Sequence, residues 1–432
     1  MIKQIFKQIW FYRRSNAWLF LEMTLIVVAS WFLVNTLWPD AYRKNLPDGF
    51  DTKGVYALQV EPLYSEQDGY SEEMDTPEQL SADFHHIGQF LRNIPEIRDL
   101  APVSATMPGL NMSNYNRGVT IDTAGGIKNV GYGYHVREAG ACDLSLMGYR
   151  RIWPENTSIE DVPGTVIITE DLSKVLFGDE NPVGRRLSEF SETPEFNYRI
   201  SGVIAPVKVS RNQEYKPFVM YAGADITQVE DGMGYLWLFT LAPGTDAEEF
   251  IRQANRTWSR QAVFGNWRVY SVLSVENLFN STARNNFTWT ALLVFLLVCI
   301  LIGVASFSWL RTRERRGEIG VRRAMGSTGC KTALPLLAEV WILQLFSLIV
   351  GLVIVLNILV LGKIDFCQTA AYRGYVSQIT IDSLPLLFDP ALHFLCVSGI
   401  IAAILLAIVT VSTAVPVAGA LKESPADVLK DE

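Results

Sequence analysis

The sequence lacks the motifs by which enzymes bind nucleotides or build common catalytic sites. It contains no GxxxxGK[ST], no GxSxG, no HExxH and no Ser, His and Asp set with a persuasive spacing. It has no CxxC, and its four histidines are too scattered for metal-ligand spacing. We therefore expect no catalytic, cofactor-binding or metal site in this chain, and we expect that it is not itself an enzyme.

Cysteine is also scarce. Of the five cysteines, only Cys142 falls within residues 40–285, so no disulfide framework is possible inside that segment. Cys142 has either Cys367 as a distant partner or none, and a lone buried thiol is the favoured interpretation.

Apolar residues make up 49% of the chain but are crowded into four stretches. Each stretch reaches the roughly 20 residues that a helix needs to cross a bilayer. The sequence therefore predicts four transmembrane helices, at residues 17–38, 287–310, 332–361 and 391–418. The middle of the chain is long enough to bury a core of its own.

The charges indicate the orientation. Residues 1–16 carry four basic residues and no acid, and residues 311–331 carry seven basic residues against Glu314 and Glu318. Both segments are expected on the cytoplasmic side, whereas residues 40–285 hold 22 basic and 34 acidic residues and are expected outside. Positive-inside bias explains the basic loop, so nothing suggests a nucleic-acid binder.

These assignments divide the chain into nine consecutive parts. They are a cytoplasmic amphipathic helix (1–16), a first transmembrane helix (17–38), an extracytoplasmic domain (39–285), a second transmembrane helix with a stalk (286–310), a cytoplasmic coupling loop (311–331), a third helix (332–361), an outer loop (362–390), a fourth helix (391–418) and a cytoplasmic tail (419–432). The N-terminal and C-terminal ends are then both cytoplasmic.

The large segment shows a strand–helix–strand order twice. The first set is predicted at 54–61, 77–93 and 97–107, and the second at 235–241, 245–258 and 267–275, with Thr245 and Glu248 as a capping box. Two such units separated by a glycine-rich, strand-rich stretch predict a split α+β sandwich, one sheet backed by two helices, with a mainly-β subdomain inserted at about 110–225.

The loop at 311–331 has a sequence pattern that its cytoplasmic location alone does not explain. As one helix it places Arg311, Arg315, Glu318 and Arg322 on a single face, and Gly326 permits a sharp stop. Ile319, Ala324 and Met325 add a small apolar element, and Gly320 follows Ile319.

Two acids fall inside the apolar stretches. Glu22 lies about one turn into the first and Glu339 about two turns into the third. An unpaired carboxylate at that depth costs a few kcal/mol, so each is expected near an interface or paired, Glu339 with an arginine of the loop. A proton relay is the less favoured alternative.

Residues 313–326, with the pattern R-x-R-R-G-E-I-G-V-R-R-A-M-G, and the following Leu-Leu-Ala-Glu at 336–339 resemble the signature of the FtsX-like and MacB-like ABC transporter permeases. The stretches at 168–178, 181–187 and 198–204 are similar to the periplasmic core domain of the MacB-like members, and Ser-Pro-Ala-Asp-Val-Leu at 424–429 to the family's closing motif.

The resemblance implies an α-helical membrane protein with four spans and a large α+β extracytoplasmic domain made of Porter-like and Sabre-like subdomains. It implies an inner-membrane location, a second permease subunit, identical or homologous, and a periplasmic or outer-membrane partner. It also implies a separately encoded cytoplasmic ATPase that holds ATP and Mg, docking on Arg315, Glu318, Ile319, Gly320, Arg322, Ala324, Met325 and Gly326. The bulky first span, with Trp18 and Trp31, departs from the glycine-rich span of many relatives.

Two rival hypotheses remain open at this point. One is a membrane-anchored sensor or scaffold whose outer domain binds a ligand or regulates an enzyme without ATP. The other is proton-driven transport, which two intramembrane acids support only weakly. The permease hypothesis leads because of the pattern in the loop.

Overall fold

The computed structural model describes residues 11, 13–110, 116–123, 126–155, 158–187, 198–211, 213–228, 234–261, 263–281, 287–367 and 384–422. The predicted amphipathic helix at 1–16 and the closing motif at 424–429 lie largely or wholly outside them. The chain divides into two compact units, each described here by itself. The helical unit comprises Met1–Pro39, Asn285–Thr369 and Pro385–Glu432, and the sheet unit comprises Asp40–Arg284 and Ala370–Leu384.

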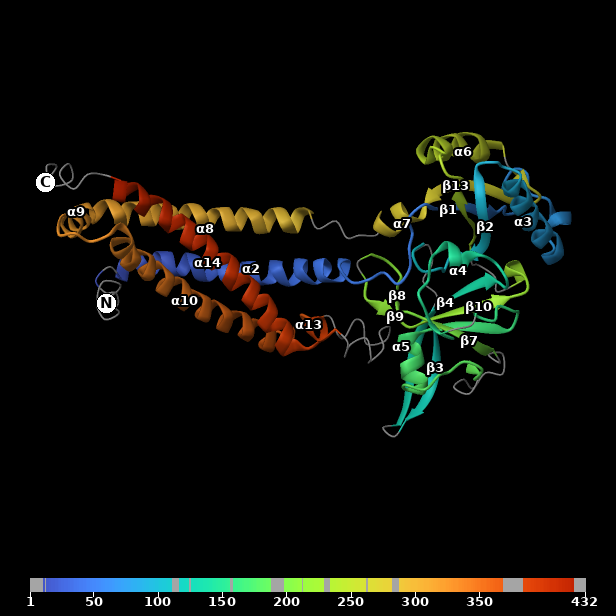
Figure 1. Cartoon of the computed structure of the whole chain (residues 1–432), viewed down its shortest axis with the longest axis horizontal. Coiled ribbons are helices and arrows are strands. Elements are labelled where there is room, and N and C mark those ends of the chain that lie inside the picture. The colour runs from blue at the N-terminus through green and yellow to red at the C-terminus, as the bar shows by residue number, and fades with distance from the viewer. Residues whose placement is uncertain are drawn as a thin grey trace. The chain divides into compact units, whose positions relative to one another are not determined.

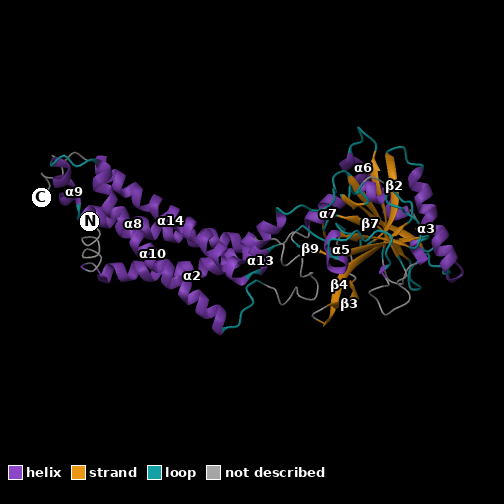
Figure 2. Ribbon diagram, turned by 60° about the horizontal axis from the view of Figure 1, so that its bottom comes forward, coloured by secondary structure: helices purple, strands orange, loops and turns teal. Residues whose placement is uncertain are grey.

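Four helices are long and apolar enough to cross a membrane, and in Figures 1 and 2 they run beside one another within the helical unit. This confirms the predicted number of apolar helices. They are α2 (Arg13–Lys44), α8 (Phe287–Glu314), α10 (Gly329–Leu361) and α14 (Pro390–Lys422), accompanied by the short α9 (Arg316–Ala324) and α13 (Pro385–Phe388).

The helices pack through an apolar core with close backbone approaches. Met23, Val27 and Trp31 of α2 are fully buried among side chains of α10 and α14. Gly351 of α10 lies against Val27, where a larger residue would collide with it. The Trp31 indole donates to Ser398 Oγ at 3.3 Å. The bulky first helix therefore packs by inserting its aromatic side chain between its neighbours.

The sheet unit contains one mixed sheet of eleven strands, seen as the orange strands of Figure 2. Ten of them run in the order β12-β13-β1-β11-β2-β4-β10-β6-β7-β5, and β3 pairs with β4. The strands are β1 (Val55–Pro62), β2 (Ile97–Ser104), β3 (Asn116–Thr123), β4 (Gly126–Glu138), β5 (Arg151–Trp153), β6 (Thr165–Thr169), β7 (Arg199–Ile204), β10 (Phe218–Gly223), β11 (Tyr235–Leu241), β12 (Val263–Phe264) and β13 (Trp267–Ser274). A separate hairpin pairs β8 (Val207–Lys208) with β9 (Tyr215–Lys216).

Helices cover both faces of the sheet. They are α3 (Pro77–Arg92), α4 (Asp143–Leu146), α5 (Glu170–Phe177), α6 (Ala247–Gln261) and α7 (Val275–Ser281). Helix α5 lies on β6 and β7, and the others lie nearer β1, β2, β11 and β13. On β11, Trp237 and Phe239 pack with α3 and α6, whereas Leu236 and Leu238 point to the opposite face, where Met147 and Val275 pack. This alternation is the period of two expected of a strand buried on both sides.

The split sandwich is confirmed in outline, with two corrections. The inserted strands do not form a sheet of their own but continue the sandwich sheet through β2 and β4, at the pair Val103 and Arg137. The predicted capping box at Thr245 is wrong, because Asp246 accepts the amides of Glu248 and Glu249 at 3.1 and 3.2 Å. An aspartate one residue further on is an equally good N-cap and gives the helix its start at Ala247.

A neutral histidine is buried where the two parts of the sheet meet. His135 of β4 has no exposed surface, and its Nδ1 lies 3.1 Å from Ser104 Oγ of β2. Burial, reinforced by the charge of Arg137, lowers the pKa of His135 to about 3. The folded protein therefore keeps this imidazole uncharged at pH values where an unfolded chain would protonate it.

This predicts an acid-dependent loss of stability in the sheet. Between pH ~6.5 and ~3 the unfolded state binds a proton at His135 that the folded state does not, so folding weakens as pH falls by up to ~1.4 kcal/mol per pH unit. Hydrogen exchange of β2 and β4 amides in the full-length protein in nanodiscs should show this slope. His135→Gln should flatten it, while the exposed His86→Gln should keep it. An unchanged slope in His135→Gln contradicts the assignment.

Candidate functional site

The segment predicted to couple to an ATPase is built as two helices rather than one. α8 ends at Glu314, and α9 begins at Arg316. Backbone hydrogen bonds still bridge the break, from the Arg315 amide to Arg311 and from the Ile319 amide to Arg315. Arg311 and Arg315, two of the four residues predicted to share one helical face, both pair with Glu339.

The break coincides with a cluster of buried charges in the helical unit. Glu339 of α10 forms ion pairs with Arg311 and with Arg315, the latter at 3.3 Å between Arg315 Nη2 and Glu339 Oε2. Arg311 also donates to Asn16 Oδ1 of α2 at 2.5 Å, and its guanidinium lies 4.8 Å from the centre of the Phe307 ring. We call Asn16, Arg311, Arg315 and Glu339 the arginine–glutamate cluster.

The cluster fixes three helices to one another near the start of α9. All four side chains are at least nine-tenths buried, so each charge depends on its partners rather than on water. Breaking a buried pair by removing one partner typically costs several kcal/mol, because the other charge stays behind without compensation. The expectation that Glu339 pairs with an arginine of the loop is confirmed.

The short helix α9 has a buried and an exposed side. Ile319 is 7% exposed and Gly320 is buried, whereas Val321 is 45% and Met325 76% exposed, with Ala324 exposed between them. Positions 321, 324 and 325 share one helical face. We call Val321, Ala324 and Met325 the α9 apolar face; it offers apolar contact area to a partner.

Gly326 ends α9 as the sequence predicts. Its φ of +89° is a left-handed conformation that residues with a side chain rarely adopt, and it directly follows the last residues of the helix. α10 then begins at Gly329 after Thr328 as N-cap. Glu318 and Arg322 lie within α9.

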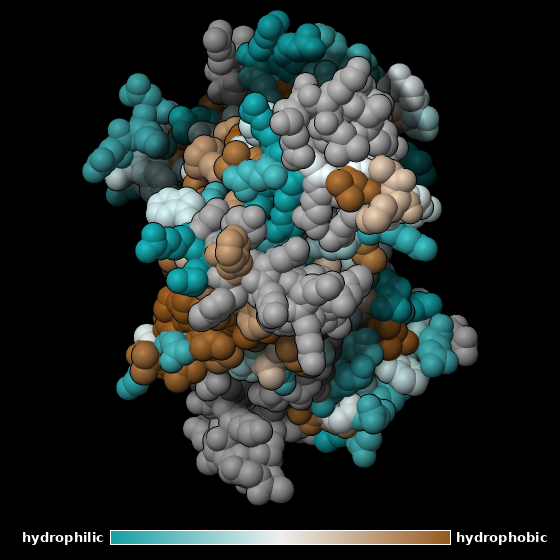
Figure 3. Space-filling model, turned by 90° about the vertical axis from the view of Figure 1, so that its left-hand side faces the viewer, coloured by the Kyte–Doolittle hydropathy of each residue, from teal (hydrophilic) through white to brown (hydrophobic). Residues whose placement is uncertain are grey.

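Figure 3 looks onto the end of the molecule that bears α9 in Figure 1. Hydrophilic and apolar side chains both reach the surface on that face.

The second acid lies elsewhere. Glu22 of α2 is half-buried, and its carboxylate lies against Gly303 of α8, where a larger residue would collide with it. The structure thus brings Glu339 together with Arg315 and packs Glu22 on a helix backbone.

Sequence reasoning missed two polar groups that hold α2. Asn16 was not singled out, although an amide at the start of an apolar stretch is a signal for a buried polar contact. His393 of α14 was set aside with the other histidines, but it is buried and its Nε2 lies 2.8 Å from Asn35 Oδ1. No spacing rule connects residues 16 and 311, or 35 and 393.

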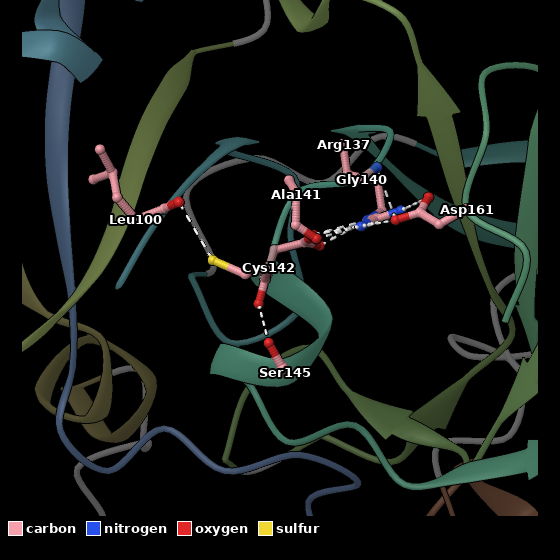
Figure 4. Close-up of polar contacts among 8 residues, drawn as sticks. Leu100, Arg137, Gly140, Ala141, Cys142, Ser145 and Asp161 are labelled. Atoms are coloured by element: carbon pink, nitrogen blue, oxygen red, sulfur yellow. Dashed lines mark hydrogen bonds and ion pairs between the residues drawn. The ribbon is translucent and has the colours of Figure 1, made fainter. Parts of the chain in front are cut away.

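The sheet unit has its own buried ion cluster where β4 meets the segments around residues 143 and 161 (Figure 4). Arg137 donates from Nε and Nη2 to Asp143, and from Nη1 and Nη2 to Asp161. Burial opposes its charge, but the bonds to the two aspartates outweigh burial and raise the pKa of Arg137. Two carboxylates around one fully satisfied arginine make a structural joint that keeps β4 and the segments at 143 and 161 together.

Cys142 lies beside this joint and is a free thiol, as favoured from the sequence. Its Sγ points to Leu100 O at 3.3 Å (Figure 4), and burial raises the pKa of the thiol. A raised pKa keeps the group protonated and unreactive. Among the described residues, no group of three or more His, Cys, Asp or Glu side chains is arranged to hold a metal ion.

Part of the helical unit is similar to a known family. Residues 290–425 match the family model of the FtsX-like permease C-terminal domain, in agreement with the resemblance read from residues 313–326. A comparison with curated proteins found no match.

Solved structures similar to part of the chain are extracytoplasmic regions. The periplasmic region of MacB from Actinobacillus actinomycetemcomitans aligns with 10% identity and a TM-score of 0.33, covering 54% of this chain and 94% of that one. The extracellular domain of the noncanonic ABC-type transporter YknZ from Gram-positive bacteria aligns with 10% identity and a TM-score of 0.29, covering 49% and 98%. Nothing below rests on these two likenesses.

The arginine–glutamate cluster makes a direct prediction for stability. Glu339→Leu leaves Arg311 and Arg315 buried without their carboxylate and should destabilise the helical unit by about 3–5 kcal/mol. Thermal unfolding of the purified protein in detergent measures this as a lower midpoint. Glu314→Gln, at an exposed acid of the neighbouring helix, is the matched control and should leave the midpoint unchanged. Equal midpoints for Glu339→Leu and wild type would contradict the role given to the cluster.

Proposed function

We propose that this chain, whose residues 290–425 match the FtsX-like permease C-terminal family, is the permease subunit of an ABC transporter. The observation that carries the proposal is α9, a short helix with an exposed apolar face whose base is held by the arginine–glutamate cluster. A helix that is attached to three long helices and exposes its other side to a partner is suited to transmit a movement of that partner to the three helices.

The proposal puts the helical unit in the inner membrane and the sheet unit outside the cytoplasm, and the four long apolar helices support it. In our proposal α9 and both termini are cytoplasmic. The seven basic residues of 311–331 and the four of 1–16 support this orientation, as does the acidic excess of residues 40–285.

The orientation predicts which residues an impermeant thiol reagent reaches. In single-cysteine variants on intact spheroplasts, a cysteine placed at the exposed Tyr64 of the sheet unit should be labelled, and Cys330 should not. As a control, Cys330 should become labelled once the membrane is permeabilised and the reagent can enter. Labelling of Cys330 from outside would reverse the orientation.

In this proposal a separate cytoplasmic ATPase holds ATP and Mg and binds α9. Val321, Ala324 and Met325 supply apolar contact, and Glu318 and Arg322 supply charge. Movement of α9 reaches α8, α10 and α2 together because the arginine–glutamate cluster joins these helices. The absence of a nucleotide-binding motif in the sequence supports hydrolysis on the partner rather than here.

The remaining partners follow from the same proposal. Large apolar side chains of α8 such as Phe295, Val298 and Ile302 are exposed and available to lipid or to a second permease subunit, identical or homologous. The sheet unit would act on a substrate or on a periplasmic or outer-membrane partner, so that ATP drives export or mechanical work outside the membrane.

Reversing both charges on α9 tests the coupling. Glu318→Lys with Arg322→Glu should remove charge-assisted contacts worth ~1.5–3 kcal/mol each, which weakens ATPase binding about tenfold or more per contact. Met325→Asp, at the most exposed position of the α9 apolar face, should act in the same direction. The measurements are ATPase co-purification and transport-linked ATP turnover in nanodiscs.

Met74→Asp in the sheet unit is the matched control, because Met74 is also exposed and should affect neither measurement. If both α9 variants keep wild-type co-purification and turnover, the basic residues of the loop serve only to orient the protein in the membrane. That result would favour the anchored sensor or scaffold instead.

A further inference from the structure

The last turn of α2 belongs to the sheet unit, where a buried lysine from the β8–β9 hairpin binds it. Lys208, in the β8–β9 hairpin, has a fully buried side chain. Its Nζ donates to Arg43 O at 2.7 Å, to Leu46 O at 2.6 Å and to Asp48 Oδ1 at 3.0 Å. An ammonium group has three donors, and all three are used here.

These contacts complete the end of the helix. The last carbonyl groups of a helix have no partner within it and carry the negative end of the helix dipole, so a cation placed there stabilises the helix end. α2 contains Pro39, which cannot donate the usual backbone hydrogen bond and weakens the helix just before its last turn. Lys208 therefore holds a turn that α2 alone supports poorly.

Three further ion pairs hold the same segment. Arg43 pairs with Glu214, which is also buried, and with Asp40 at 3.3 Å, while Arg211 pairs with Asp48. The backbone of the hairpin joins in, because the Lys208 amide donates to Asp48 O at 3.1 Å. We call residues 40–48 together with residues 207–216 the clamp.

Backbone geometry fits the clamp closely. Gly49 has a φ of +88° and lies against the carbonyl of Pro206, where a residue with a side chain would collide with it. Phe50 follows and packs on Phe279 of α7 with ring centres 5.4 Å apart, and the Arg211 guanidinium lies 6.0 Å from the same ring. The clamp therefore also contacts α7, the last described helix before α8 along the chain.

The buried charge makes the arrangement all-or-none. Burial lowers the pKa of Lys208, and the hydrogen bond and charge of Asp48 oppose that effect. A buried ammonium that loses its acceptors is costly, so Lys208 either keeps all three or leaves the interior for water. Partial loosening of the α2 end is thus disfavoured.

We propose that Lys208 is the positioning residue through which movement of the first apolar helix is delivered to the sheet, by way of the β8–β9 hairpin and β10. The inference rests on the proposed function for the origin of that movement. The alternative route, a rigid stalk from α7 into α8, runs through residues 282–286, which lie outside the described residues.

The test uses the full-length protein in nanodiscs, alone and with its ATPase, and follows amide hydrogen exchange by mass spectrometry. In Lys208→Met alone, exchange at residues 43–48 should rise about tenfold or more, which corresponds to ~1.4 kcal/mol. In the complex, the change that ATP causes in the exchange of β7 and β10 should be lost, while ATPase co-purification stays at the wild-type level.

Lys174→Met is the matched control. Lys174 is an exposed lysine that pairs with Glu170 one turn away, and its loss should change neither measurement. If Lys208→Met loses protection throughout the sheet, Asp48→Ala decides by the same two criteria, because it removes one acceptor of Lys208 and leaves the lysine in place.

Each result has one meaning. The role of Lys208 is overturned if exchange at residues 43–48 is unchanged in the variant. It is also overturned if exchange there rises but the ATP-dependent change in the exchange of β7 and β10 is undiminished. If the wild-type chain neither binds an ATPase nor responds to ATP, the proposed function fails, and the first measurement alone judges whether Lys208 holds the end of α2.

Discussion

The pairing of Glu339 with Arg311 and Arg315 is the constraint on which the helical unit depends most. A carboxylate and two guanidiniums in surroundings this apolar are tolerable only together. Arg315 lies between α8 and α9, so its pairing with Glu339 attaches the start of α9 to α10.

The sheet unit solves a comparable problem with the opposite ratio of charges. There one arginine, Arg137, is shared by two aspartates, at the only register pair that links β2 to β4 in the described strands. A single pair of residues is a narrow connection between two halves of a sheet. The ion pairs of Arg137 stabilise this junction. The buried, neutral His135 beside it makes the junction sensitive to acid.

Much of the fold could be predicted from the sequence, because it depends on local patterns. The strand predicted at 235–241 is β11 at the residues observed, and the four apolar runs give the four long helices. The pairing of Asn16 with Arg311 could not be predicted, since it joins residues far apart in the chain and carries no periodicity. Local reasoning failed at the α6 cap, where two adjacent residues were both competent.

α2 is held near both of its ends by cations from other parts of the chain. Near its start Asn16 accepts from Arg311, and at its end the carbonyls of Arg43 and Leu46 accept from Lys208. Between these points apolar packing, such as Val27 against Gly351, is joined by hydrogen bonds of Trp31 with Ser398 and of Asn35 with His393. Apolar packing has little directional preference, whereas a hydrogen-bonded cation fixes an atom to an atom. Attachment by a cation near each end, with further hydrogen bonds between, is what the proposed transmission of displacement along α2 requires.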